Sequence, residues 1–209
     1  MKAKILTLRP WCLGALIVFW ALGFGLPSLA WRATPELEQE IAQKRATVVQ
    51  NPNDPFANFD LAITYAYTNH IQDGWNKLKK AEELDHKFRQ KGLALYISKV
   101  TADPQDWRLR FRLAFAYYFN EKKTDAIREL ENVITLDPYN VWAYGYIALI
   151  YGELNNIDQA MAFTKKGLKI DSNVAALHLL LSEGYYKKGD SWRGLIERME
   201  ALRLKALGF

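Results

Sequence analysis

A fixed period of 34 residues constrains this chain more than any other feature of its sequence. The segment LAFAY at 113–117 recurs as IALIY at 147–151 and again as LSEGY at 181–185. A period of this length is typical of stacked helical hairpins, because each hairpin leaves an apolar face that only a neighbouring hairpin can cover. The pattern therefore predicts an all-α chain whose units stack on one another.

Three regular repeats follow from this period, at 107–140, 141–174 and 175–208. Each joins two helices through a short polar turn, such as NEKK at 120–123, and such turns connect antiparallel helices. The helix pairs are expected at 107–119 with 123–136, 141–154 with 157–170, and 174–187 with 191–207. The last helix should present a polar outer side to water, as a terminal repeat requires. Its candidate capping residues are Arg193, Glu197, Arg198, Arg203 and Lys205.

The N-terminal side of the stack is irregular. An N-terminal helix is expected at about 34–54, followed by a first hairpin at 55–86. The step from Leu61 to the equivalent Leu113 is one period plus 18 residues, which is room for one inserted helix at 87–103. Two pairings remain open. Either 35–50 pairs with 56–69 and 73–84 with 88–101, giving five hairpins, or 56–84 is a hairpin with an unpaired helix on each side.

An apolar run occupies residues 11–30, WCLGALIVFWALGFGLPSLA, and contains no charge. Twenty apolar residues are enough to cross a bilayer as a helix. Basic residues precede the run and acidic residues follow it, so the positive-inside rule sends the rest of the chain across the membrane. Residues 1–31 are thus a signal anchor or a cleaved signal peptide with its cleavage site at 28–30. Both alternatives place 32–209 on the extracytoplasmic side, in a single-pass membrane protein or in a secreted or periplasmic one.

The net charge of +5 does not indicate nucleic-acid binding. Lys2, Lys4 and Arg9 lie in the N-terminal segment. Without these three, the chain has 25 basic and 23 acidic residues and is nearly neutral. A nucleic-acid interface needs a basic stripe on the folded surface. Cys12 is the single cysteine, so no disulfide can form within the chain.

The repeats resemble the tetratricopeptide repeat family, whose 34-residue signature sets large, small and aromatic residues at fixed spacing. Its Leu-Gly-x-x-Tyr part is matched by Leu61/Ala62/Tyr65, Leu113/Ala114/Tyr117, Ile147/Ala148/Tyr151 and Leu181/Ser182/Tyr185. Its small residue in the second helix is matched by Gly74, Ala126, Ala160 and Gly194. Its early tryptophan is absent. The resemblance covers 55–208 apart from the inserted helix and implies that 32–209 form a right-handed superhelical solenoid. The apolar run adds one N-terminal helix before it.

The sequence shows no constellation of catalytic, cofactor-binding or metal-binding residues. The histidines, His70, His86 and His178, have no acidic or thiol partners at metal-ligand spacing. The pattern contains no phosphate-binding glycine loop and no nucleophile elbow. We therefore expect a protein that is not an enzyme, carries no cofactor and has no small-molecule substrate.

The resemblance implies that the first helices line a concave groove that takes up a partner protein or peptide. Aromatic residues and arginines are the types that dominate interface energetics. The expected groove residues are Arg108, Phe111, Arg112, Phe115, Tyr118, Phe119, Trp142, Leu149 and Tyr186. The sequence thus predicts a membrane-tethered scaffold for assembly of a cell-envelope complex. The alternative is a constitutive structural subunit of a larger membrane protein complex.

Overall fold

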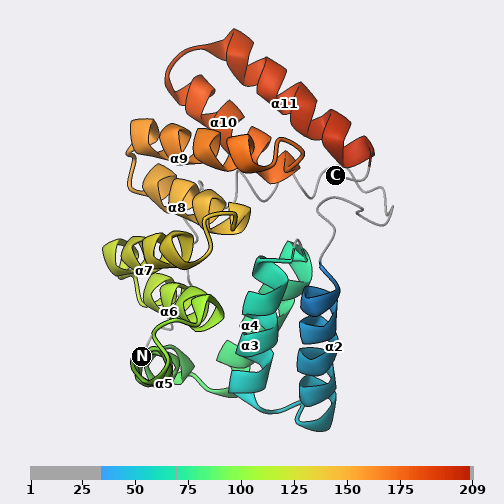
Figure 1. Ribbon diagram of the computed structural model, residues 1–209, viewed down its shortest axis with the longest axis vertical. Coiled ribbons are helices and arrows are strands. Elements are labelled where there is room, and N and C mark those ends of the chain that lie inside the picture. The colour runs from blue at the N-terminus through green and yellow to red at the C-terminus, as the bar shows by residue number, and fades with distance from the viewer. Residues whose placement is uncertain (1–33, 69, 208–209) are drawn as a thin grey trace, which may run out of the picture. The chain divides into compact units, whose positions relative to one another are not determined.

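The computed structural model describes residues 34–68 and 70–207, and these fold into ten α-helices without a strand (Figure 1). The helices are α2 (Pro35–Gln50), α3 (Pro55–Ala66), α4 (Ile71–Leu84), α5 (Phe88–Ala102), α6 (Trp107–Phe119), α7 (Lys123–Leu136), α8 (Val141–Glu153), α9 (Ile157–Ile170), α10 (Ala175–Lys187) and α11 (Ser191–Ala206). In the repeat region, each helix boundary lies within one residue of its expected position. The described residues form two compact units, 34–144 and 145–207, which divide within α8.

The predicted apolar helix at 11–30 lies outside the described residues. Within the described part of the chain, no helix is both long and apolar enough to cross a membrane.

Side-chain caps fix where several helices begin. The carboxylate of Asp106 accepts hydrogen bonds from the backbone N–H groups of Arg108 at 2.7 Å and Leu109 at 3.2 Å, at the start of α6. Asp54 caps α3 in the same way, accepting from Phe56 N–H at 2.8 Å. Such caps satisfy backbone donors that have no partner within the helix, and each contributes about 1 kcal/mol. Local sequence therefore sets these boundaries.

The three repeat turns share one backbone conformation. Glu121, Asn155 and Gly189 lie at 34-residue intervals and have φ values of 60°, 60° and 79°. This left-handed region suits glycine and is tolerated by asparagine, whereas other residues are strained there. The repeat therefore extends to the turn geometry, even where the residue type does not favour it.

The first hairpin is formed by α3 and α4, which pack against each other, and α2 also packs against α3. The inserted helix α5 packs mainly against α6 and touches α4 only slightly. Of the two pairings that the sequence leaves open, the structure has the hairpin of α3 with α4, but neither flanking helix is unpaired, because α2 packs on α3 and α5 on α6. Helix α5 thus covers α6 on the side opposite α7.

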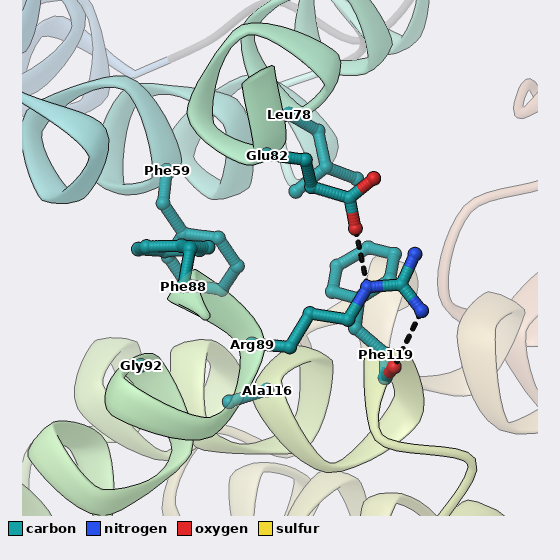
Figure 2. A pocket seen from close by; sticks show the side chains of 8 residues that line it. All are labelled: Phe59, Leu78, Glu82, Phe88, Arg89, Gly92, Ala116 and Phe119. Atoms are coloured by element: carbon teal, nitrogen blue, oxygen red, sulfur yellow. Dashed lines mark hydrogen bonds and ion pairs between the residues drawn. The ribbon is translucent and has the colours of Figure 1, made fainter. Parts of the chain in front are cut away.

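Aromatic rings fill the space between α3, α5 and α6. Phe59 lies 5.2 Å from Phe88, 5.3 Å from Tyr96 and 6.3 Å from Phe119, measured between ring centroids. Figure 2 shows Phe59 and Phe88 beside each other, with Arg89 directed between Glu82 and the backbone of Phe119. Because Phe59 and Tyr96 are almost completely buried, these rings form part of the core of the N-terminal unit.

Small residues let the helices of the C-terminal unit approach closely. A Cβ atom added at Gly184 on α10 would lie 2.5 Å from Cγ of Met161 on α9, and one at Gly194 would lie 2.8 Å from the ring of Tyr186. The hydroxyl of Ser182 donates a hydrogen bond of 2.7 Å to the carbonyl of Gly194. The small positions of the repeat pattern therefore mark places where α9, α10 and α11 meet.

The expected polar outer side of α11 is present only in part: Arg193 and Arg203 are exposed. Glu197 and Arg198 turn inward: the carboxylate of Glu197 accepts a hydrogen bond from His178 Nδ1 at 2.7 Å, and Arg198 pairs with Glu183. Between Arg193 and Arg203 lie exposed apolar residues, namely Leu195, Ile196 and Met199, and Trp192 precedes them. The terminal helix therefore exposes an apolar stripe together with a few charges.

A charged network and polar pocket as the candidate functional site

Arg112 lies at the centre of a buried polar network in the N-terminal unit. Its guanidinium is almost fully buried. Nη2 donates to Glu40 Oε1 at 3.0 Å, to Thr64 Oγ1 at 2.9 Å and to Tyr67 Oη at 3.2 Å. Nε lies 3.3 Å from Oδ1 of Asp60. One side chain of α6 thus contacts α2, α3 and the residue directly after α3.

Further contacts tie the two carboxylates in place. Asp60 pairs with Lys44 of α2 at 3.0 Å and accepts a hydrogen bond from the hydroxyl of Tyr96 on α5. Glu40 accepts from Tyr67 and from Arg108 Nε, the latter at 2.9 Å. A buried charge is tolerated only when it is paired and hydrogen-bonded. Both carboxylates are paired and hydrogen-bonded, whereas Nε of Arg112 is paired with Asp60 but makes no hydrogen bond within the described part of the chain. The network thus joins α2, α3, α5 and α6.

The network shifts the pKa values of its acidic groups. Burial alone would raise the pKa of Glu40, but the Tyr67 hydrogen bond and the Arg112 charge outweigh it, and the pKa lies below its ordinary value. Burial alone would also raise the pKa of Asp60, but the charges of Arg112 and Lys44 outweigh it, and this pKa is lowered too. Burial raises the pKa of Tyr67 to about 12, so its hydroxyl stays protonated. Both carboxylates are therefore charged and Tyr67 is neutral at neutral pH.

An open pocket of about 390 Å³ lies over this network. Its floor includes Glu40, Asp60 and Arg112, and its rim carries the side chains of α2, α5 and α6 that reach solvent. Of the described residues that line it, only Leu109 is apolar. The rim residues with polar ends are Glu36, Gln39, Gln43, Lys99 and Arg108. The pocket therefore offers both hydrogen-bond donors and acceptors above a fixed charged base.

A second, much smaller cavity of about 10 Å³ lies among the aromatic core residues, lined by Phe59, Phe88 and Phe119 among others (Figure 2). A space of this size holds at most about one water molecule. It is a packing gap and not a binding site.

The structure separates the expected groove residues into three groups. Phe111, Arg112 and Trp142 are buried, so in this structure their side chains offer almost no surface to a partner. Phe115, Tyr118, Phe119, Leu149 and Tyr186 are half-buried. Phe119 packs on Phe115 and Tyr118 as well as on Phe59. Two of the expected residues line the polar pocket: Arg108, whose side chain is 37% exposed, at its rim, and the buried Arg112 at its floor. Partner contact through the half-buried residues stays a prediction.

Sequence reasoning missed the acidic members of the site. Glu40 lies on a helix with a mostly polar sequence, and Asp60 lies directly before the apolar run at 61–63. A charge beside such a run is the signal that could have indicated Asp60, because buried carboxylates need cationic partners. No group of acidic, histidine and cysteine residues in the described part of the chain could hold a metal ion.

Comparison with known proteins agrees with this architecture. Residues 120–184 match the tetratricopeptide repeat family. The match covers less than half of the chain and runs from the first repeat turn into α10. It leaves out the charged network and the inserted helix α5. The tetratricopeptide pattern thus describes the regular part of the stack.

Solved structures of similar fold extend the likeness over most of the chain. A structure described as "MamA RS-1 ArsTM double mutant" is 15% identical, with a TM-score of 0.54, and the alignment covers 81% of this chain and 85% of that one. "MamA MSR-1 C2" is 16% identical, with a TM-score of 0.51, covering 82% and 95%. At these identities the likeness concerns the fold alone. No curated protein matches the sequence.

Proposed function

We propose that this chain is a non-enzymatic protein-interaction scaffold that binds a polar segment of a partner protein in the pocket between α2, α5 and α6. The observation that carries the proposal is the combination of a fixed base and a solvent-facing rim. Arg112, Glu40 and Asp60 hold one another in place, while the rim side chains extend into an open space of about 390 Å³. A preorganised surface loses little conformational entropy on binding.

The chemistry of the rim selects the kind of partner. Lys99, Arg108 and the amides of Gln39 and Gln43 can donate to carboxylates and backbone carbonyls, and Glu36 can accept from an amine or a backbone N–H. Because Leu109 is the one apolar residue there, an aromatic or aliphatic segment would gain little. We therefore propose that the bound segment of the partner is polar.

Membrane tethering belongs to the proposal as well. The charge-free run at 11–30 is long enough to span a bilayer, and α2 begins only a few residues after it. A scaffold in this position would hold its partner close to the membrane, as assembly of a cell-envelope complex requires. Protease added to intact spheroplasts should then degrade 32–209. Protection of that region would contradict this topology.

Site-specific cross-linking tests the pocket. A photo-reactive residue at Gln43, on the rim, should capture a discrete partner in cells, whereas the same residue at the exposed Thr135 of α7 should not. Lys99→Ala combined with Gln39→Ala should reduce capture about tenfold or more, with an unchanged circular dichroism spectrum and melting temperature. Capture at Gln43 that survives both changes would place partner binding elsewhere on the chain.

A further inference from the structure

The apolar stripe on α11 is unusual for the last helix of a stack. Trp192 is 71% exposed and Met199 58% exposed, and Leu195 and Ile196 lie between them on the same side. The spacing of these residues keeps them on one face of the helix. Scattered apolar residues need no explanation, but a continuous stripe on one helix face indicates an interaction surface.

The preceding repeat shows what covers the equivalent surface. Met161 of α9 lies 34 residues before Leu195, and its side chain packs on Gly184 of α10, the first helix of the next hairpin. A long side chain of a second helix thus meets a small residue of the following first helix. By this equivalence the face of α11 fits a helix that carries small residues at the matching positions.

Helix α2 has such a face. Ala42, Ala46 and Val49 are exposed, and Val49 is 79% exposed. They lie on the side of α2 away from Leu37, Ile41 and Val48, which pack toward the core. This face is also separate from the pocket, because none of these three outer residues lines it.

The two faces have matching spacing. Along α11 the positions 192, 195, 199 and 203 are separated by three, four and four residues. Along α2, read in the opposite direction, 49, 46, 42 and 38 have the same separations. In an antiparallel pair Trp192 therefore meets Val49, Leu195 meets Ala46 and Met199 meets Ala42, with large side chains opposite small ones.

The ends of the two stripes carry opposite charges. The fourth pair of the register sets Arg203 of α11 against Glu38 of α2, and both residues are exposed. Arg203 also pairs with Glu200 of its own helix. Glu36 and Lys205 extend the acidic and basic ends of the two helices. A parallel arrangement would instead bring Arg203 toward the C-terminal end of α2, where residues 47–50, TVVQ, include no acidic residue. Charge at the rim of an interface fixes orientation and register in this way.

We propose that α11 of one copy packs antiparallel on α2 of a second copy, so that the chains associate head to tail. The contact is heterologous: each copy that donates its α11 face keeps a free α2 face. Such contacts form open chains unless their rotation closes a ring. This inference does not depend on the pocket, since the two surfaces use different residues.

Complementation of two variants tests the proposal on the full-length chain in mild detergent. Met199→Glu places a carboxylate in the α11 stripe, and Ala42→Glu does so in the α2 stripe. Both positions are exposed and helical, so the fold should persist. Light scattering should show mass rising with concentration for the wild type, and association at least about tenfold weaker for each variant alone. A 1:1 mixture should form dimers and nothing larger. The intact α11 of Ala42→Glu can pack on the intact α2 of Met199→Glu, and the other two faces of that dimer carry the introduced carboxylates.

The controls separate this contact from others. Thr47→Glu, exposed on α2 but outside the stripe, should associate like the wild type. Self-association of Ala42→Glu alone would indicate that α11 pairs with α11, and would overturn the proposal. Association of both variants would indicate contacts through other parts of the chain, including residues 1–30. A wild-type chain that stays monomeric at every concentration would overturn the proposal too.

Cross-linking in membranes gives a test that does not use detergent. Cys12→Ser removes the single native cysteine, and Ala46→Cys with Leu195→Cys then places one thiol on each face. A short bis-maleimide should join these chains into a ladder of multimers. The chain with Leu195→Cys alone should give no more covalent dimer than a control chain with Thr47→Cys alone. Dimers from Leu195→Cys alone, with no ladder from the double variant, would contradict the head-to-tail contact.

Discussion

The guanidinium of Arg112 donates a hydrogen bond of 3.0 Å to the carboxylate of Glu40, a residue 72 positions earlier in the chain. This contact joins the helix that precedes the first hairpin to the first helix of the regular repeats. Neither side chain is matched by the tetratricopeptide signature, so the pair belongs to this chain and not to the general pattern. Its energetic role can be measured directly.

Removing the central cation should strongly destabilise the N-terminal unit. Arg112→Ala leaves Glu40 and Asp60 partly buried without their main counter-charge, and breaking a buried ion pair in this way costs about 3–5 kcal/mol. Chemical denaturation followed by circular dichroism would measure the loss. Arg193→Ala, at a position with 66% side-chain exposure, should change the free energy of unfolding by less than about 0.5 kcal/mol. Equal small effects would mean that the network contributes little.

Stability should fall at acidic pH through the same network. The folded-state pKa values of Glu40 and Asp60 lie below their ordinary values of 4.5 and 3.8. The stabilisation is therefore fully present above the ordinary values and is lost as pH falls through the lowered ones. In Glu40→Gln the denaturation midpoint should be lower at neutral pH and should depend less on pH between about 6 and 3. Parallel pH profiles for the two proteins would contradict this assignment.

Relieving the strained turn should stabilise the first regular repeat. Glu121 has φ of 60°, a conformation that costs a residue with a side chain roughly 1–2 kcal/mol. Glycine relieves this strain, but it also has more conformational entropy in the unfolded chain, which offsets part of the gain. Glu121→Gly should therefore raise the free energy of unfolding by up to about 1 kcal/mol. The reverse change at the equivalent position, Gly189→Ala, should lower it. A loss of stability in Glu121→Gly would show that the glutamate side chain contributes to the turn.

Filling a close contact between α10 and α11 should be costly. The Cβ atom of Gly194→Ala would lie within 3.0 Å of the Tyr186 ring. The ring must move, and overpacking of this kind costs about 1–3 kcal/mol. Thermal denaturation should show the effect, and the combined change Tyr186→Leu with Gly194→Ala should recover part of it. Additive losses in the double variant would indicate that the two positions do not interact.

The helices of the regular repeats could be predicted because their determinants are local. The caps, the polar turns and the 34-residue period all lie within a few residues of the boundaries that they set. Helix pairing on the N-terminal side could not be predicted in the same way. It depends on α5 packing mainly against α6, and no pattern within α5 itself specifies that neighbour.

The site was harder to predict than the fold because its members are far apart in sequence. Arg108 and Arg112 were expected in a groove, since arginine is common at interfaces. Arg112 is buried because Glu40 and Asp60 meet it from two other helices, and no local pattern connects these residues. The expectation of a polar outer face on α11 failed in part for a related reason. Its orientation is set by close packing at Gly194 and Ala201, and this packing turns Glu197 and Arg198 inward.

The 72-residue separation of Arg112 and Glu40 has a consequence for how the chain acquires its structure. Closing so long a loop costs more entropy than forming a hairpin, and contacts of long range slow folding. In the C-terminal unit, contacts such as that of Ser182 with Gly194 join residues close in sequence. The half of the protein that the ribosome makes first should therefore be the half that finishes folding last.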